Sequence, residues 1–273
     1  DLWVETTFDS DGDGKLDMLT STGSSWKQYY NRKNIKEYVI YKIINGFGVP
    51  TTITYKPMTN TDLYVMQASD YNINADAFSP ISGASLVSQV STQSNTHSSV
   101  KVKYQYGGML FHKKGLGSLG FQMLRTTDLQ TGVVSETQYF QKYSGNHSAK
   151  IGLPVYSEQR KNGYLLSKAI NKLTVKGTAQ GGLHPYISRS EEFAYVYNSN
   201  GTNTPLSITT TTNSMDTWGN PTMINIRLTD QSNDHYLNTK TTNTWGNSSE
   251  QRYGRLKQTT VVKNRTGDAH NKT

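Results

Sequence analysis

The sequence lacks cysteine, long apolar runs and dense clusters of charge. Because none of the 273 residues is cysteine, disulfide bonds, zinc–thiolate sites and thiol catalysis are excluded. No stretch approaches the roughly 18 apolar residues that a membrane-spanning helix requires, so we expect no membrane span. Secreted eukaryotic proteins of this polarity usually carry disulfides, so the absence of cysteine favours a bacterial origin.

The charge of the chain is positive but scattered. A net charge of +8 and a pI near 9.4 raise nucleic acid as a partner. However, the Lys and Arg residues form no dense stripe and no pattern in which basic and aromatic residues alternate, as nucleic-acid-binding modules often show. We therefore predict a diffuse positive surface and no nucleic-acid partner.

What the chain does have is the composition of many short strands. Hydrophobic residues make up only 34%, while Thr, Ser, Asn, Gly and Tyr are abundant, and this mixture suits half-exposed strands joined by polar turns. From Val100 to Tyr106, apolar or aromatic residues alternate with Lys and Gln, which predicts a strand with one wet face. Residues 70–97 read as longer loops, and the ambiguous residues 27–45 favour strand. The other strand candidates are 3–5, 16–20, 51–56, 121–127, 133–142, 165–175, 192–197, 206–212, 222–229, 237–244 and 256–263.

One internal repeat supports stacked hairpins. Asp216-Thr-Trp-Gly-Asn220 recurs as Asn243-Thr-Trp-Gly-Asn247, and each copy follows a Thr-rich strand. Gly and Asn can supply the positive φ values of a tight turn, so both copies are predicted hairpin turns. The fold class that follows is all-β, with antiparallel sheets of stacked hairpins that form a shell or a sandwich.

An acidic loop near the start is the strongest chemical signal. Residues 9–17 read D-S-D-G-D-G-K-L-D, with alternating carboxylates and glycines that allow a sharp turn. Ca²⁺ takes six to eight oxygen ligands in a flexible cage, and this loop fits that demand. It is not a standard EF-hand, because Thr20 stands where the bidentate Glu is expected. A solvated acidic turn is the alternative interpretation. The predicted structural Ca²⁺ ligands are Asp9, Asp11, Asp13 and Asp17, with the carbonyl of Lys15.

Other patterns that could indicate catalysis are weak. The six histidines have no metal-binding spacing, and Glu191-Glu192 is a poor candidate for the carboxylate pair of a glycosidase. Gly115 to Gly120 superficially fits the dinucleotide fingerprint G-x-G-x-x-G, but the following residues read as strand where that motif requires a helix. We therefore predict no enzymatic activity and no catalytic residue.

Three segments resemble the B components of Tc-type insecticidal toxin complexes, which carry RHS/YD-repeat shells. Residues 9–19 look like the end of an FG-GAP/VCBS repeat, a calcium-binding propeller-blade motif. Residues 43–59 resemble the segment that follows this repeat, and residues 102–154 resemble the start of the shell, where V-K-Y-Q-Y-G-G, G-L-G-S-L-G-F, D-L-Q-T-G, Y-F-Q and G-L-P occur in order. The two repeat copies are similar to divergent YD repeats, with Met215-Asp216 in place of Tyr-Asp. These likenesses divide the chain into 1–45 (end of the calcium repeat), 46–200 (middle and shell region) and 201–273 (YD/RHS-like hairpins).

The resemblance implies a non-enzymatic structural module of a secreted, extracellular bacterial toxin. Such a module would form part of a β shell that encloses or helps deliver a cytotoxic polypeptide. Its implied partners are a channel-forming subunit and the enclosed C-terminal toxin polypeptide. The alternative is an extracellular glycan-binding or adhesion module, in which exposed Tyr and Trp side chains stack on sugars. The chain opens inside a predicted strand and ends in a polar tail, which indicates a piece of a longer polypeptide.

Overall fold

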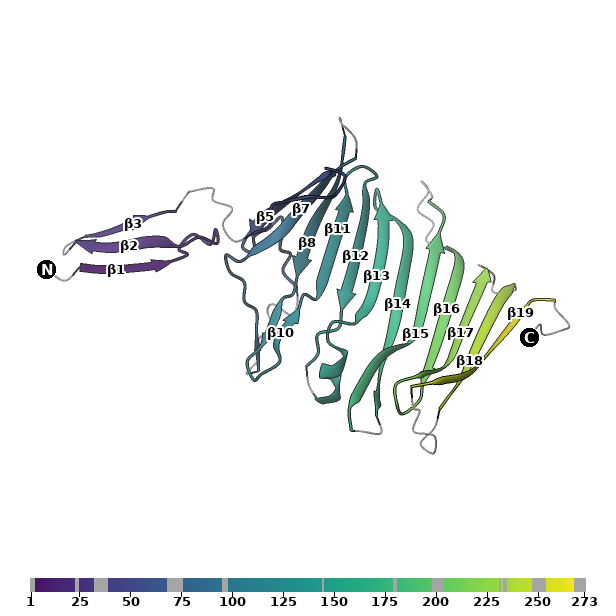
Figure 1. Cartoon of the computed structure of the whole chain (residues 1–273). Helices are drawn as coiled ribbons and strands as arrows, with labels where there is room; N and C mark the ends of the chain where they lie inside the picture. Colours follow the sequence, from purple (N-terminus) through teal and green to yellow (C-terminus); the bar gives the residue numbers. More distant parts are fainter. Residues whose placement is uncertain are drawn as a thin grey trace. The chain divides into compact units, whose positions relative to one another are not determined.

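The fold is almost entirely β, as predicted. The computed structural model describes residues 3–22, 25–31, 39–67, 76–94, 98–143, 145–178, 181–197, 204–230, 232, 235–246 and 254–267. Strands make up 64% of the described residues, which contain no α-helix and one 3₁₀ helix, η1 (Gly145–Lys150) (Figure 1). Among these residues, no helix has the length and apolarity needed to cross a membrane.

The chain divides into two compact units, Asp1–Gly132 and Val133–Thr273. The predicted domain boundaries after residues 45 and 200 stay predictions. Unit 1 holds a three-stranded sheet in the order β1-β2-β3, a small sheet β10-β9-β6, and the paired strands β4-β5-β7-β8-β11. The bounds are β1 Trp3–Phe8, β2 Asp17–Thr22, β3 Trp26–Tyr29, β4 Lys42–Ile44, β5 Pro50–Pro57, β6 Ala77–Phe78, β7 Ser85–Gln93, β8 Ser99–Gly107, β9 Leu110–His112, β10 Gly117–Gly120 and β11 Met123–Asp128.

Unit 1 contains the apolar core. All seven fully buried hydrophobic side chains among the described residues belong to this unit: Met58, Leu63, Tyr64, Ala77, Leu110, Leu119 and Met123. The segment around Tyr64 connects the core to β8. The Val65 amide donates to the Tyr106 carbonyl, and the Tyr106 amide donates to the Leu63 carbonyl. The Tyr64 hydroxyl accepts a hydrogen bond from the Met109 amide, just after β8, at 2.8 Å. The alternation predicted for β8 is observed in its central part, where Lys101 and Lys103 are exposed and Val102 and Tyr104 are half buried. It does not extend to Val100, which is exposed, or to Gln105, which is half buried.

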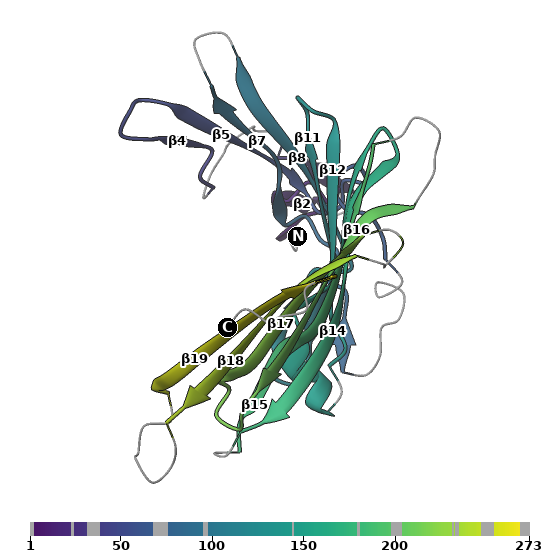
Figure 2. The same cartoon turned by 90° about the vertical axis from the view of Figure 1, so that its right-hand side faces the viewer.

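Unit 2 is one antiparallel meander. Each strand pairs with the next along the chain in the order β12 to β19, with η1 between β12 and β13. Figure 1 shows these strands side by side, and Figure 2 shows them turned by 90°. Their bounds are β12 Val133–Tyr139, β13 Pro154–Lys161, β14 Tyr164–Gly177, β15 Leu183–Tyr195, β16 Pro205–Met215, β17 Pro221–Asp230, β18 Tyr236–Trp245 and β19 Leu256–Arg265. None of the buried hydrophobic side chains of the described residues lies here. The strands of unit 2 therefore keep accessible side chains on both faces, with η1 packed against β14 and β15.

Several strand predictions need correction. Residues 70–97 were expected to form loops, but β6 and β7 lie in this stretch, and β7 pairs with both β5 and β8. Strand β13 and the first half of β15 were not predicted. The turn prediction holds for Asp216–Asn220, which joins β16 to β17, but it is wrong for Asn243–Trp245, which continue β18. Residues 32–38 of the ambiguous segment and residues 247–253 lie outside the described residues.

Candidate functional site

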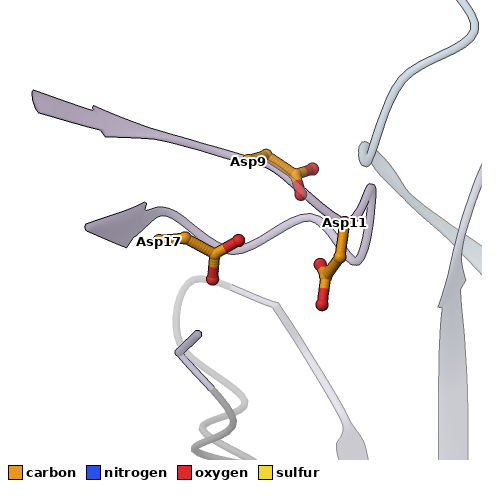
Figure 3. Close-up of side chains that lie close together, drawn as sticks. All are labelled: Asp9, Asp11 and Asp17. Atoms are coloured by element: carbon orange, nitrogen blue, oxygen red, sulfur yellow. The ribbon is translucent and has the colours of Figure 1, made fainter. Parts of the chain in front are cut away.

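The acidic loop lies between two paired strands. The pair Phe8↔Asp17 ends the β1–β2 ladder, so the intervening residues form the turn of a hairpin. Within this turn the carboxylates of Asp9, Asp11 and Asp17 each offer an oxygen, and these oxygens lie within 4.8 Å of one another (Figure 3). Among the described residues this is the one group of three or more potential metal-ligating side chains. Three of the five predicted ligands are therefore brought together.

Backbone amides hold two of these carboxylates in place. Asp9 Oδ1 accepts hydrogen bonds from the amides of Gly12 (2.7 Å) and Asp13 (3.1 Å), and Asp9 Oδ2 accepts one from Gly14 at 3.0 Å. Asp17, which is only 2% exposed, accepts from the Ser10 hydroxyl and, at 2.8 Å, from the Asn31 amide. These two bonds hold the pKa of Asp17 below its ordinary value, so the least exposed carboxylate of the loop is kept ionised.

The other two predicted ligands pair with each other. Lys15 Nζ lies 2.8 Å from Asp13 Oδ2, and the Lys15 amide donates to Asp13 Oδ1 at 2.9 Å. The carboxylate of Asp13 is thus outside the group of three and already has a cationic partner. Whether Asp13 and the Lys15 carbonyl bind a metal stays a prediction.

The donor set fits a hard divalent cation. Three carboxylates this close repel one another unless a cation neutralises them. Oxygen is the ligand that Ca²⁺ prefers. Asp11 Oδ2 accepts no hydrogen bond from a described residue, because its one described bond, from the Asp13 amide, goes to Oδ1. The loop therefore offers both a charge to neutralise and a carboxylate oxygen with open coordination sites.

Two residues that sequence reasoning missed hold the loop from outside. The Thr59 hydroxyl donates a hydrogen bond to the Gly12 carbonyl. Gly14 has φ +86° and packs so tightly on Gly83 that a Cβ on Gly14 would lie 2.1 Å from the Gly83 carbonyl oxygen. A Cβ on Gly83 would lie 1.9 Å from Asp9 Oδ2. Nothing in the linear sequence indicates this contact, since Gly83 is 69 residues away from Gly14.

The patterns that could have indicated an enzyme do not assemble into sites. Glu191 and Glu192 are neighbours on a strand and therefore point to opposite faces of the sheet; Glu191 pairs with Arg189 at 2.6 Å. The glycine-rich segment forms the β9–β10 hairpin, with Gly117 opposite His112, so no helix follows it. This confirms that the dinucleotide pattern is coincidental.

The repeated tryptophans do not form an exposed platform. Trp218 and Trp245 are both half buried, and Trp245 Nε1 donates to the Pro221 carbonyl at 2.9 Å. A sugar-stacking surface needs accessible ring faces, so this arrangement favours a structural role for both side chains.

One face of unit 2 carries a fixed polar network. The Tyr156 hydroxyl donates to Glu158 Oε2 at 2.7 Å. Arg160 donates two hydrogen bonds to the same carboxylate, from Nε to Oε1 at 2.7 Å and from Nη2 to Oε2 at 2.8 Å. Burial and the bond to Glu158 raise the pKa of Tyr156 to about 12. This phenol therefore stays protonated at neutral pH, and the network serves to fix side chains on the sheet.

Comparison with known proteins agrees with this architecture. A family model described as the insecticide toxin TcdB middle/N-terminal region matches residues 4–147, just over half of the chain. No curated protein sequence matches.

Two solved structures share the fold. Crystal structures of TcdB2-TccC3, with and without its hypervariable C-terminal region, superpose with a TM-score of 0.67 over 96% of this chain at 10–11% identity. The chain spans only 17% of the length of those proteins. The predicted kinship with Tc toxin B components is confirmed by the family match, and the chain belongs to the insecticide toxin TcdB middle/N-terminal family.

Proposed function

We propose that this chain is a non-enzymatic wall segment of a secreted bacterial toxin, in a β shell that encloses or helps deliver a cytotoxic polypeptide. The observation that carries the proposal is the construction of unit 2. Its eight strands form one antiparallel sheet, and none of the buried hydrophobic side chains of the described residues belongs to it. Globular sheets normally cover at least one face with another layer.

The physical role of such a sheet is separation of two aqueous spaces. Backbone hydrogen bonds between neighbouring strands make the sheet continuous. Strands of up to 14 residues set its extent along the strand direction. Thr and Tyr suit strands that are half exposed on both sides. In β16, four consecutive Thr residues (209–212) place hydroxyl and methyl groups on each face in turn.

The proposed partners are a channel-forming subunit and the enclosed C-terminal toxin polypeptide. The structural relatives support this choice, since they are TcdB2-TccC3, with and without its hypervariable C-terminal region. The RHS/YD-like character of the hairpins after residue 200 and the extracellular location belong to the same proposal.

Calcium is proposed as a structural ion in the first hairpin, at the end of an FG-GAP/VCBS-like repeat. Asp9, Asp11 and Asp17 would supply carboxylate oxygens, with Asp13 and the Lys15 carbonyl completing the set. The ion would neutralise the three clustered carboxylates and fix the turn that packs on Gly83 and Thr59.

The wall role can be tested in the full-length toxin protein assembled with its C-terminal polypeptide. Ile208 lies in β16 between Phe193 and Thr229, and proline there would remove a ladder hydrogen bond from an interior strand. We expect Ile208→Pro to expose the enclosed polypeptide to added protease, while the matched control Ile208→Val keeps it protected. Equal protection in both variants of a correctly assembled complex would argue against the wall role.

A further inference from the structure

The register of unit 2 sorts its side chains into two unlike faces. Directly paired residues of an antiparallel ladder share a face, so the pairs can be followed across β12 to β16 as rows. Two adjacent rows make up one surface, which we call the polar trough: Thr137, Ser157, Ala169, Glu192 and Thr209, and beside them Ser135, Gln159, Ser167, Ala194 and Ser207.

The polar trough is a real depression. All ten residues line one hollow of about 500 Å³. Glu136, Glu158, Lys168 and Phe193 also border it, but the strand register assigns their side chains to the opposite face. A second hollow of about 500 Å³ shares Thr137, Ser157, Ala169 and Glu192, and extends the depression toward Ser190, Thr211 and Asn213. The strands that carry it, β12 to β16, lie next to one another in Figure 1.

The polar groups of the trough are unengaged. Eight of the ten side chains carry a hydroxyl, amide or carboxylate group, and none of these groups forms a hydrogen bond or ion pair with a described residue. None of their atoms is sealed from solvent either. The trough therefore presents open donors and acceptors along five strands.

The opposite face of the same strands differs in that most of its polar side chains are paired with each other. Its rows are Glu136, Glu158, Lys168, Phe193 and Ile208, and Gln138, Tyr156, Ile170, Glu191 and Thr210. Here the polar groups are engaged: Gln138 donates to Glu136 at 3.0 Å, Arg160 and Tyr156 hold Glu158, and Lys168 Nζ lies 4.7 Å from the Phe193 ring centre. Among the polar residues of these two rows, all but Thr210 have a described partner, since Glu191 pairs with Arg189.

We propose that the polar trough is the surface that contacts an extended polypeptide held inside the assembly, and that the opposite face points outward. The inference rests on the proposed wall role and adds to it which face meets the enclosed chain. A hydroxyl group both donates and accepts, so Ser and Thr can bond either the N–H or the C=O of any peptide backbone. Contact of this kind does not depend on the sequence of the occupant.

The chemistry of the trough disfavours other occupants. The ten residues include no aromatic ring on which a sugar or a base could stack, and the adjoining hollow is lined by a single ring, that of Tyr139. They include no cation to pair with phosphate, and their one charged group, the Glu192 carboxylate, repels polyanions. A neutral or basic polypeptide is the class of ligand that remains.

Strand β16 offers matched positions for a test, because Thr209 and Thr211 face the trough side while Thr210 and Thr212 face the opposite side. In the full-length protein co-assembled with its C-terminal polypeptide, each Thr is replaced singly by Cys and loaded with a benzophenone maleimide before assembly. This chain contributes no cysteine of its own, and the unsubstituted protein reports any background from the rest of the assembly. A second measurement is the labelling of each assembled Cys variant by a large maleimide-polymer added from outside.

We expect Thr209→Cys and Thr211→Cys to cross-link the enclosed polypeptide and to lose labelling from outside. Thr210→Cys and Thr212→Cys should label and give no such cross-link. Cross-links from positions 210 and 212 alone, or equally from all four positions, would overturn the assignment of the trough while leaving the wall role intact. Full labelling at all four positions with no cross-link anywhere would refute the wall role itself, and the trough assignment with it.

Discussion

The hydrogen bonds of the turn at Asp216 allow us to predict how much the free energy of unfolding changes when this residue is replaced. Asp216 Oδ1 accepts the amides of Trp218 at 2.8 Å and Asn220 at 2.9 Å, and Oδ2 accepts the Asn220 side-chain amide at 3.0 Å. Gly219, with φ +84°, supplies the left-handed residue that closes the turn. Replacing Asp216 by Ala removes all three side-chain bonds and leaves the backbone bond from Asp216 to the Asn220 carbonyl.

A hydrogen bond to a charged group contributes about 1.5–3 kcal/mol when it is well protected. This turn is only half buried, so water can replace part of what is lost. We expect Asp216→Ala to lower the free energy of unfolding by about 2 kcal/mol in total, and Asp216→Asn, which keeps one acceptor oxygen, by about 1 kcal/mol or less. The neighbouring Thr217 is exposed and its side chain has no described hydrogen bond. Thr217→Ala should therefore change the free energy of unfolding by less than about 0.5 kcal/mol.

Denaturant unfolding of the three variants beside the unsubstituted protein measures these differences. Burial acts to raise the pKa of Asp216, but the bonds from Asn220 and Trp218 outweigh it and hold the pKa below its ordinary value. The charge-dependent part of the stabilisation is therefore present above the unfolded-state pKa, near 4, and is lost as the pH falls through the folded-state pKa. Unfolding that is identical for Asp216→Ala and Thr217→Ala at pH 7 would refute this account of the turn.

Two predictions concern the acidic loop. We expect millimolar Ca²⁺ to raise the melting temperature of the unsubstituted protein and Asp11→Asn, which removes one of the clustered carboxylates, to abolish that rise. Differential scanning calorimetry measures both, and a rise of equal size in the two proteins, or in neither, would contradict the metal site. Gly83→Ala would place a Cβ against Asp9 Oδ2 and the Gly14 backbone, so it should loosen the packing of the loop and speed up the hydrogen exchange of residues 9–17; unchanged exchange would show that the Gly14–Gly83 contact is absent in solution.

The sequence predicts unit 2 well where strand and turn chemistry are local. Strands β14, β16, β17, β18 and β19 each contain a Thr-rich or alternating stretch that indicates strand in isolation. The Asp216–Asn220 turn is readable because its Asp, Gly and Asn each satisfy a local backbone requirement. The turn prediction is wrong for the second copy because the Asn243 side chain bonds the two neighbouring strands. It donates a hydrogen bond to the Pro221 carbonyl and accepts one from the Thr259 hydroxyl.

The errors come from contacts that join distant parts of the chain. Strand β7 (S-L-V-S-Q-V-S-T-Q) has a loop-like composition, and it becomes a strand because β5 and β8 pair with its two edges. Tertiary pairing overrides the local preference there. The Gly14–Gly83 contact is similarly invisible in the sequence, and the separation of Asp13 from the other carboxylates depends on its local pairing with Lys15.

The low hydrophobic content has a physical explanation in this division of the chain. A sheet that is covered on one face needs an apolar residue at every second position, whereas a sheet with water on both faces does not. The exposed apolar side chains of unit 2 are therefore not required by the sheet itself and call for a separate explanation. Three of them, Leu206, Leu228 and Leu237, are 58%, 38% and 55% exposed and line one hollow of about 350 Å³ at the β16–β19 end. Exposed apolar clusters destabilise an isolated protein by inviting aggregation, so their presence fits a segment that functions within a larger assembly rather than alone.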